Sequence, residues 1–193
     1  GDVLKARDRA WVLSSWQVIV DEYPVMGTEI KITTAAYEFK GFMGMRNFII
    51  ETTDGKRLAW ANSNWTHLVI STGLPARLTP ADTDNYVLSK KMEMDYAPRK
   101  IKLPDSMIPQ ESFAVQKHHL DTNHHVNNCQ YICMAEDFLP EDFKVYQMRA
   151  EYKMQAKLGD TICPKTKTEA GKVVVSLNDE NGKPYAVVEF TEK

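Results

Sequence analysis

The residues best suited to chemistry lie in one short stretch, residues 117–131. This stretch holds four of the five histidines of the chain, together with one aspartate and three asparagines. Asp121, Asn123 and His125 stand at alternate positions, so in an extended or looped segment their side chains project to the same side. If a helix begins just after them, its first unpaired amides lie nearby and can stabilise a developing oxyanion. A carboxylate, an amide and an imidazole beside such amides suit acyl transfer to water.

Two other interpretations of this stretch stay open. Aspartate and asparagine residues before a helix often accept hydrogen bonds from its first amides, and this capping role is the more common one for any single residue. We expect it for the side chains of Asn127 and Asn128. Zinc binding is the second alternative, because histidine-rich tracts can hold this metal. No Cys-x-x-Cys or His-Glu-x-x-His spacing supports it, however, and His118, His119 and His124 are expected to be solvated or structural.

The overall composition sets limits on function and location. The chain has 193 residues and a formal net charge of −2, which gives no support for nucleic-acid binding, since that function usually brings a strongly basic surface. No stretch approaches the roughly 18 apolar residues of a membrane span, and residues 1–10 do not resemble a signal peptide. The three cysteines have no spacing typical of a disulfide framework, and Cys129 and Cys133 are interpreted as small buried helix residues. We therefore expect a soluble, cytoplasmic protein.

The first half of the chain is predicted to form an antiparallel sheet. Four segments rich in β-branched and aromatic residues are expected to be strands: residues 11–20, 28–39, 42–52 and 57–72. Asp54 and Gly55 favour a tight hairpin turn between the last two strands. Thr79 and Pro80 are typical of a helix start, so a short helix is expected over residues 79–91.

The second half repeats this plan with its helix placed earlier. Residues 96–110 hold three prolines and are expected to form an extended linker. The first unit is therefore residues 1–95, and the second is residues 111–193. In the second unit a helix is expected over residues 127–138, after the histidine-rich loop. Its strands are expected at residues 111–117, 146–156, 161–169, 173–177 and 185–191.

Both units are predicted to share one α+β plan, in which a strongly bent antiparallel sheet wraps around one helix. Residues 54–56 correspond to residues 181–183, and residues 27–28 correspond to residues 159–160. The first unit, however, has only residues 2–9 ahead of its first strand. We expect it to lack its opening strand and most of its helix, so that either upstream residues or another chain must complete it.

The histidine-rich stretch resembles a family signature. Residues 121–131 read Asp-Thr-Asn-His-His-Val-Asn-Asn-Cys-Gln-Tyr, which is similar to the Asp-x-Asn-x-His-Val-Asn-Asn-x-x-Tyr pattern of acyl-acyl-carrier-protein thioesterases from plant plastids and bacteria. Residues 9–16 and 37–41, with Arg46, resemble the first sheet of that family, so the similarity extends over nearly all of the chain. The resemblance implies a tandem of two hotdog units that hydrolyses the thioester between a fatty acyl chain and acyl carrier protein, with no metal or organic cofactor.

The resemblance also implies a role for each polar residue of the loop. Asp121 is expected to act as nucleophile, forming a mixed anhydride, or as general base for water. Asn123 is expected to position the carboxylate or the thioester. His125 is expected to orient or protonate through its neighbours.

Two further features of the site follow from the resemblance. The backbone amides of Val126, Asn127 and Asn128 are expected to polarise the thioester carbonyl. The family often has a glutamate three residues after a tyrosine in the strand that follows the catalytic helix, whereas this chain has Tyr152 followed by Gln155. Glutamine can orient a water molecule but cannot take its proton at neutral pH, so any base role passes to the loop.

The partner implied by the resemblance is acyl carrier protein, which is acidic and calls for basic residues near the pocket mouth. The expected docking residues are Lys40, Arg46, Arg99, Lys100 and Lys102. Two other functions stay open, an acyl-CoA thioesterase of the same fold and a non-catalytic acyl-binding module, which Gln155 and the truncated first unit favour. A monomer whose two units form a pseudo-dimer and a homodimer are both compatible with the sequence.

The acyl pocket is expected mainly in the first unit, and the catalytic loop in the second. Aromatic and methionine residues of the first unit should form its core, and a few of them should line the acyl cavity. The candidates are Trp11, Trp16, Phe39, Phe42, Met43, Met45, Trp60 and Trp65.

Overall fold

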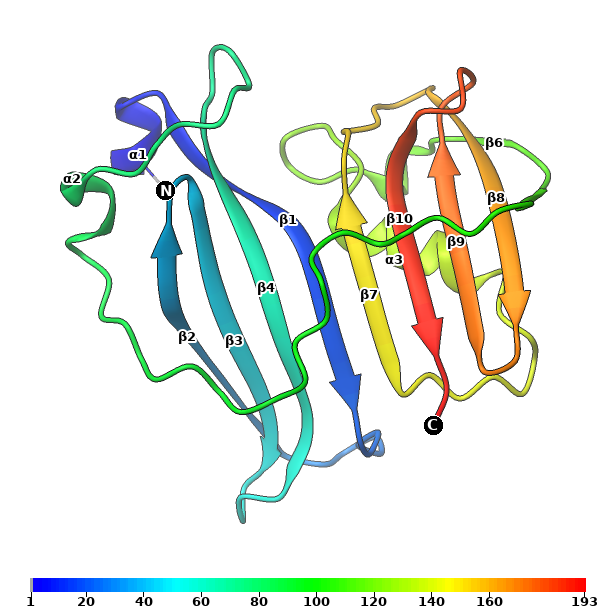
Figure 1. Cartoon of the computed structure of the whole chain (residues 1–193), viewed down its shortest axis with the longest axis horizontal. Helices are drawn as coiled ribbons and strands as arrows, with labels where there is room; N and C mark the ends of the chain where they lie inside the picture. The colour runs from blue at the N-terminus through cyan, green and yellow to red at the C-terminus, as the bar shows by residue number, and fades with distance from the viewer. Residues whose placement is uncertain (1) are drawn as a thin grey trace. The chain divides into compact units, whose positions relative to one another are not determined.

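The chain forms two compact units in the computed structural model, which describes residues 2–193. Backbone contacts divide it into Gly1–Ala97, called unit 1, and Pro98–Lys193, called unit 2. Each unit is an antiparallel sheet with short helices (Figure 1). Among the helices within residues 2–193, none combines the length and the apolar character that a bilayer span requires.

The sheet of unit 1 has four strands in the order β2-β3-β4-β1. They are β1 (Arg9–Val20), β2 (Ile30–Lys40), β3 (Met43–Thr52) and β4 (Arg57–Val69). All four predicted strands are confirmed, with ends shifted by up to three residues. The turn between β3 and β4 also forms as expected, because Gly55 has a φ of +90° that favours glycine, and the amide of Thr52 donates to the carbonyl of Lys56 at 2.9 Å.

The helix predicted over residues 79–91 is wrong beyond its first turn. Its start is confirmed, with Thr79 as N-cap and proline at the first position, but α2 spans only Pro80–Thr83. The chain then becomes extended, and the amide of Ser89 donates to the carbonyl of Ala36 at 2.9 Å. Such tertiary hydrogen bonds override helix propensity, which differs among ordinary residues by less than about 1 kcal/mol each.

The sheet of unit 2 has the order β7-β10-β9-β8-β5, and a further short strand, β6, pairs with β8. The strands are β5 (Ile108–Pro109), β6 (Phe113–Ala114), β7 (Gln147–Tyr152), β8 (Thr161–Glu169), β9 (Lys172–Asn178) and β10 (Pro184–Thr191). The four long strands confirm the prediction. The strand expected over residues 111–117 is limited to β6 and is followed by a 3-10 turn, η1 (Lys117–His119), while β5 lies inside the predicted linker.

Helix α3 (Asn128–Glu136) packs against β9 and β10 on one face of the unit 2 sheet (Figure 1). Its buried residues are Tyr131, Met134 and Ala135. Cys129 and Cys133 are exposed, so the interpretation of both as buried is wrong. The helical period explains this, because residues 129 and 133 lie on the side of the helix opposite to its buried stripe.

Unit 1 differs from unit 2 in what accompanies its sheet. Within residues 2–97 the helices are α1 (Asp2–Ala6) and the single turn of α2. No strand of this described range pairs with the outer edge of β2, whereas in unit 2 the strands β5 and β6 pair with β8. The predicted contrast between the two units is therefore confirmed for the described residues.

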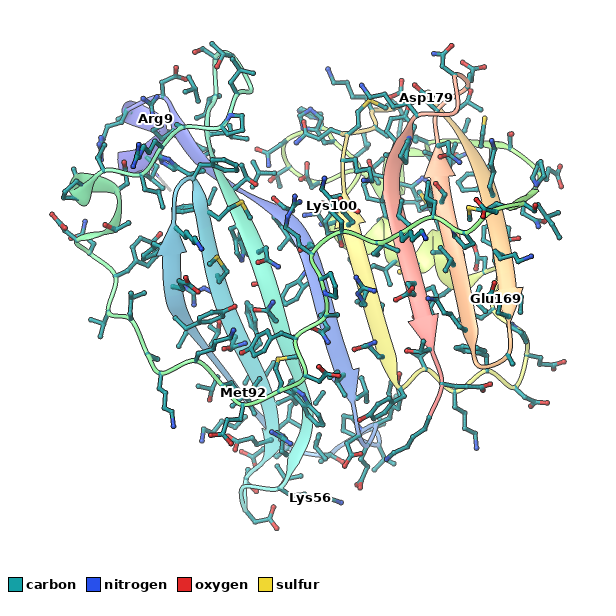
Figure 2. All side chains as sticks on the ribbon, viewed as in Figure 1. Arg9, Lys56, Met92, Lys100, Glu169 and Asp179 are labelled. Atoms are coloured by element: carbon teal, nitrogen blue, oxygen red, sulfur yellow. The ribbon has the colours of Figure 1, made fainter. Side chains whose placement is uncertain are left out.

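In unit 1, buried polar side chains hold the extended segment that follows α2. Asn47 Oδ1 accepts the amide of Met92 and the hydroxyl of Tyr96, both at 3.1 Å. Gln17 Oε1 accepts the amide of Ala97 at 2.9 Å. Met92 marks this segment in Figure 2. The sheet thus satisfies backbone groups of a segment that has no strand partner.

In unit 2, charged side chains form hydrogen bonds with the backbone of the next part of this extended segment. Arg149 donates to the carbonyl of Lys100 at 3.1 Å, and Glu151 accepts the amide of Ile101 at 3.0 Å. Arg149 also forms an ion pair with Glu189, with 2.7 Å between Nη1 and Oε1. Lys100 is labelled on this segment in Figure 2.

Candidate active site

The loop around Asp121 is a compact turn built on its own carboxylate. Asp121 Oδ1 accepts the amide of Asn123 at 2.8 Å and that of His125 at 3.2 Å. The amide of Asp121 donates back to the carbonyl of His125 at 2.8 Å. His124 closes the turn with a φ of +61°, a left-handed conformation that is uncommon outside glycine. The turn brings the three predicted side chains together, and both backbone bonds go to the same carboxylate oxygen of Asp121.

The carboxyl group of Asp121 is held in its ionised form. Partial burial alone raises its pKa, but hydrogen bonds from the amides of Asn123 and His125, with the Asn123 side chain and the His125 charge, outweigh burial and lower the pKa below its ordinary value of 3.8. Asp121 is therefore a carboxylate at neutral pH. This is the form that a nucleophile or a general base requires.

Backbone pairing fixes this turn to its surroundings. Leu120 and Val126 pair across the loop as an isolated antiparallel bridge, and His125 pairs in the same way with Lys157. The amide of Val126 also donates to the carbonyl of Ala156 at 2.9 Å. The loop is therefore bound to the segment that follows β7.

Asn127 caps α3, as predicted. Its Oδ1 accepts the amide of Cys129 at 2.9 Å, which satisfies one of the unpaired amides at the helix start. The capping role predicted for the Asn128 side chain is wrong, because Asn128 is the first residue of the helix and Asn127 already holds the N-cap position.

The three amides expected to polarise the thioester carbonyl have different partners. The amide of Val126 donates to Ala156, and the amide of Asn127 donates to the carbonyl of His119 at 2.8 Å. In the part of the chain that the structure describes, the amide of Asn128 donates no hydrogen bond to a carbonyl group. Asn128 is therefore the one of the three whose amide is available to an oxyanion.

Gln155 and His119 differ in their hydrogen bonding. Gln155 directly precedes Ala156, and within residues 2–193 its exposed side chain makes no hydrogen bond. His119 Nδ1 accepts the amide of Gln116 at 2.9 Å, while burial and the nearby His118 lower its pKa. His119 is thus a neutral residue that closes η1, which confirms its structural interpretation.

The histidines of the loop are not arranged as metal ligands. No group of three or more histidine, cysteine, aspartate or glutamate side chains within residues 2–193 is placed to hold a metal ion. The rings of His118 and His119 contact each other edge to face, with centroids 4.1 Å apart. The polar groups that meet in the turn are those of Asp121, Asn123 and His125.

Unit 1 contains an apolar cavity of about 190 Å³. Its lining comes from all four strands and from the segment after α2: Trp11, Ala36, Phe39, Gly44, Met45, Arg46, Trp65 and Tyr86. The rings of Trp11 and Phe39 stack with centroids 5.8 Å apart, and a Cβ at Gly44 would lie 3.1 Å from both rings. Phe42, also expected in the core, is 44% exposed instead. The cavity has the aromatic and methionine lining that suits a flexible alkyl chain.

The five basic residues expected to dock a carrier protein are divided between the units. Lys40 is exposed at the end of β2. Arg46 instead lines the cavity and donates to Thr34 Oγ1 at 3.1 Å. The other three are exposed near the start of unit 2: Arg99, Lys100 and Lys102.

A polar pocket of about 500 Å³ lies beside the basic segment of unit 2. Lys167 and Lys172 line it together with Lys102, and the carboxylates of Asp105 and Glu169 reduce its positive charge. The two strand lysines were not singled out from the sequence. Because they face the same pocket as Lys102, they extend its basic surface onto β8 and β9.

Family models match both halves of the chain. The acyl-ACP thioesterase N-terminal domain matches residues 1–86, and the acyl-ACP thioesterase C-terminal domain matches residues 103–189. Together these matches cover most of the chain.

Two curated plant relatives are similar at low identity. The chain is 26% identical over 169 residues to a chloroplastic acyl-[acyl-carrier-protein] hydrolase of Cuphea viscosissima, which covers 80% of this chain and 40% of the relative. It is 27% identical over 160 residues to a chloroplastic palmitoyl-acyl carrier protein thioesterase of Arabidopsis thaliana, covering 75% of this chain and 38% of the relative. The chain thus spans about two fifths of the length of these relatives.

The fold is similar to that of a solved acyl-ACP thioesterase from Bacteroides thetaiotaomicron. The TM-score is 0.89 at 20% sequence identity, and the match covers 98% of this chain and 79% of that chain. This likeness confirms the tandem hotdog fold. With family models matching both of its halves, the chain belongs to the acyl-ACP thioesterase family.

Proposed function

We propose that this protein hydrolyses thioesters between fatty acyl chains and acyl carrier protein, releasing a free fatty acid. The observation that carries the proposal is the ionised carboxylate of Asp121, which its own turn fixes through one oxygen. The same loop leads to Asn128, whose available amide at the start of α3 can bind an oxyanion. Membership of the family supports the substrate class.

Two routes use the same carboxylate. As a nucleophile, Asp121 Oδ2 attacks the thioester carbonyl carbon, the C–S bond breaks, and the leaving thiolate takes up a proton. Water then cleaves the resulting mixed anhydride and regenerates the carboxylate. As a general base, Asp121 instead takes a proton from the water that attacks the same carbon, the C–S bond then breaks, and the leaving thiolate takes up that proton. In both routes the carbonyl oxygen becomes negative, and we assign the amide of Asn128 to it.

Asn123 and His125 support this carboxylate. The side chain of Asn123 contributes to the lowered pKa of Asp121, which agrees with a positioning role. His125 is partly buried in the same turn, and we assign it the orientation or protonation of the leaving group. Gln155 is proposed only to orient water, because an amide cannot take its proton at neutral pH.

The acyl chain and the carrier protein have separate candidate sites. The apolar cavity of unit 1 is proposed for the acyl chain, and Arg46 belongs to its lining. Lys40 is proposed for the acidic carrier protein, together with Arg99, Lys100 and Lys102. A cytoplasmic location, in agreement with the three free cysteines, and a pseudo-dimeric monomer or a homodimer complete the proposal.

A matched assay tests the proposed function. Purified protein is given acyl-carrier-protein and acyl-CoA thioesters of the same chain length, and release of free thiol is measured. Faster turnover of the carrier-protein thioester is expected. Faster turnover of the CoA thioester would identify an acyl-CoA thioesterase, and acyl binding without turnover of either would identify a non-catalytic binding module.

A further inference from the structure

Two tyrosines, one buried and one half-buried, link α3 to the chain around the end of β7. Tyr131 on α3 is 2% exposed, and its Oη accepts the amide of Ala156 at 2.8 Å. Tyr152, the last residue of β7, donates its hydroxyl to the carbonyl of Asn128 at 3.0 Å. The ring centroids lie 6.1 Å apart. Tyr152 therefore bonds to the backbone of α3, which carries Tyr131. Tyr131 bonds to the backbone just after β7, which carries Tyr152.

Ala156 joins this pair to the catalytic loop. It is fully buried, its amide donates to Tyr131, and its carbonyl accepts the amide of Val126 at 2.9 Å. The next residue, Lys157, pairs with His125. A displacement of Ala156 therefore moves the backbone of the loop that holds His125.

Ala156 lies in the connection between β7 and β8, outside any strand. The start of this connection is held to the sheet by the amide of Met154, which donates to the carbonyl of Tyr185 at 3.1 Å. Its end forms a turn in which the amide of Lys157 donates to Asp160 Oδ2 at 2.9 Å. Between these points, the phenol from α3 supplies the partner for the Ala156 amide, which burial would otherwise leave unsatisfied.

Both phenols stay neutral in this environment. Burial raises the pKa of Tyr131 to about 12, although the bond from Ala156 opposes the rise. Burial also raises the pKa of Tyr152. Neither side chain is therefore a base at neutral pH, and their contribution is to geometry.

We propose that Tyr131 and Tyr152 form a reciprocal latch that sets the position of the Asp121 turn relative to the start of α3. The carboxylate of Asp121 lies in the turn, and the available amide of Asn128 lies on the helix. A thioester held between these two groups requires a fixed separation between them. The kinetic part of this inference rests on the proposed function, whereas the geometric part does not.

Tyr131→Phe tests the latch by removing Oη while keeping the ring. We expect kcat to fall roughly 10- to 100-fold, because small displacements of reacting groups cost rates of this size, while KM stays unchanged. The Ala156 and Val126 amides should exchange with deuterium faster than in the wild type. Tyr152→Phe should show the same pattern with a smaller loss. Tyr146→Phe, a tyrosine ahead of β7, is the control and should change neither readout.

The outcomes separate the latch from the proposed function. Unchanged kcat and unchanged amide exchange in Tyr131→Phe would overturn the latch, and so would a loss of activity that merely follows the melting temperature in all three variants. If Tyr131→Phe does not fold, Tyr152→Phe decides with the same two readouts. If the wild type hydrolyses no thioester, the proposed function fails, and amide exchange alone then decides whether the latch exists.

Discussion

The sheets of units 1 and 2 follow one plan, but only the sheet of unit 2 is covered by a helix of more than two turns within the described residues. Under α3, the strands β9 and β10 are buried along nearly their whole length. In unit 1, β2 is exposed over its first five residues and β3 is mostly half-buried, and an apolar cavity lies at the sheet. The covering helix also brings the available amide of Asn128 to the end of the loop. The groups proposed for catalysis therefore lie in unit 2, and the cavity proposed for the acyl chain lies in unit 1.

The units also differ in how they hold the extended segment between them. Unit 1 uses the neutral amide of Asn47, whereas unit 2 uses the charged group of Arg149, which is paired with Glu189. A buried charge that loses its partner costs more than a buried amide that does so. Substitution of the anchoring residue is therefore expected to destabilise unit 2 more than unit 1.

Substitution of Asp121 is the strongest test of the assignment of catalysis to unit 2. In Asp121→Asn the side-chain oxygen can still accept the two amides of the turn, but the negative charge is lost. We expect kcat to fall by roughly 10²- to 10⁴-fold with acyl binding intact. Thiol release and binding of a non-hydrolysable acyl analogue measure the two quantities.

Asp179 provides a matched control for this change. Its Oδ1 accepts the amides of Asn181 at 3.0 Å and Lys183 at 2.7 Å, in the hairpin between β9 and β10 (Figure 2). This is the same pattern of bonds, two and four residues ahead, that Asp121 makes. Asp179→Asn should leave kcat unchanged. Equal losses in the two variants, or near-normal turnover of Asp121→Asn, would contradict the assignment.

The ionic anchor of unit 2 predicts the largest change in stability. Arg149→Ala removes one of the two cations paired with the buried Glu189, which keeps its ion pair with Lys172. It also removes the hydrogen bonds to the carbonyls of Pro98 and Lys100, and the free energy of unfolding should fall by about 3 kcal/mol. Urea unfolding measures the loss. Lys90→Ala removes a pair with Glu93 that is almost fully exposed and should have little effect. A similar loss of unfolding free energy in both variants would contradict the expectation that a buried ion pair contributes more than an exposed one.

The amide anchor of unit 1 predicts a smaller change. Asn47→Ala leaves the amide of Met92 without its acceptor, whereas the hydroxyl of Tyr96 keeps the carbonyl of Met92 at 2.8 Å. The unsatisfied amide should cost about 1–3 kcal/mol. If the two units unfold in separate transitions, this variant should shift only that of unit 1. A loss larger than that of Arg149→Ala would reverse the comparison between the anchors.

The cavity of unit 1 should control substrate choice without controlling the chemical step. In Gly44→Ala the new methyl group meets the rings of Trp11 and Phe39 at 3.1 Å and narrows the cavity. We expect kcat/KM for the longest accepted acyl chain to fall roughly tenfold relative to a shorter one. Competition assays with mixed chain lengths measure this ratio, and an unchanged ratio would mean that the acyl chain binds elsewhere.

The smallest expected effect is in the titration of Asp121. Because its pKa in the folded protein lies below the ordinary 3.8, the group stabilises the fold above that pH, and this contribution is lost as pH falls through the lowered pKa. The carboxyl carbon signal in NMR should therefore titrate with a midpoint below 3.8. A midpoint at or above this value would mean that burial outweighs the bonds of the turn.

Local signals predicted most of the fold because hairpin turns and strands depend on nearby residues. Asp54 and Gly55 form the expected turn, and the long strands follow the β-branched segments. The helix expected over residues 79–91 was wrong because the amide of Ser89 finds its acceptor in Ala36, far away in the sequence. The side of α3 that carries Cys129 could not be assigned either, since the position of the sheet decides which side is buried.

In the candidate site, too, the features that depend on nearby residues were predictable, and those that depend on distant residues were not. The grouping of Asp121, Asn123 and His125 was visible from their spacing, because the turn that gathers them is local. The amides of Val126 and Asn127 were expected to face the substrate, but carbonyl groups that meet them only in the folded chain accept their hydrogen bonds. Tyr131 was present in the family signature, yet its role became visible only once Ala156 lay beside it.

The turn at Asp121 also has a consequence for the order of events during synthesis. Its two carboxylate bonds join residues two and four positions apart, so the turn can close as soon as His125 has left the ribosome. Closing a loop of about ten residues takes only about 10–100 ns, whereas a ribosome needs seconds to add the thirty residues that separate Val126 from Ala156. The carboxylate can therefore be oriented before Ala156, which binds the loop in the folded chain, has left the ribosome.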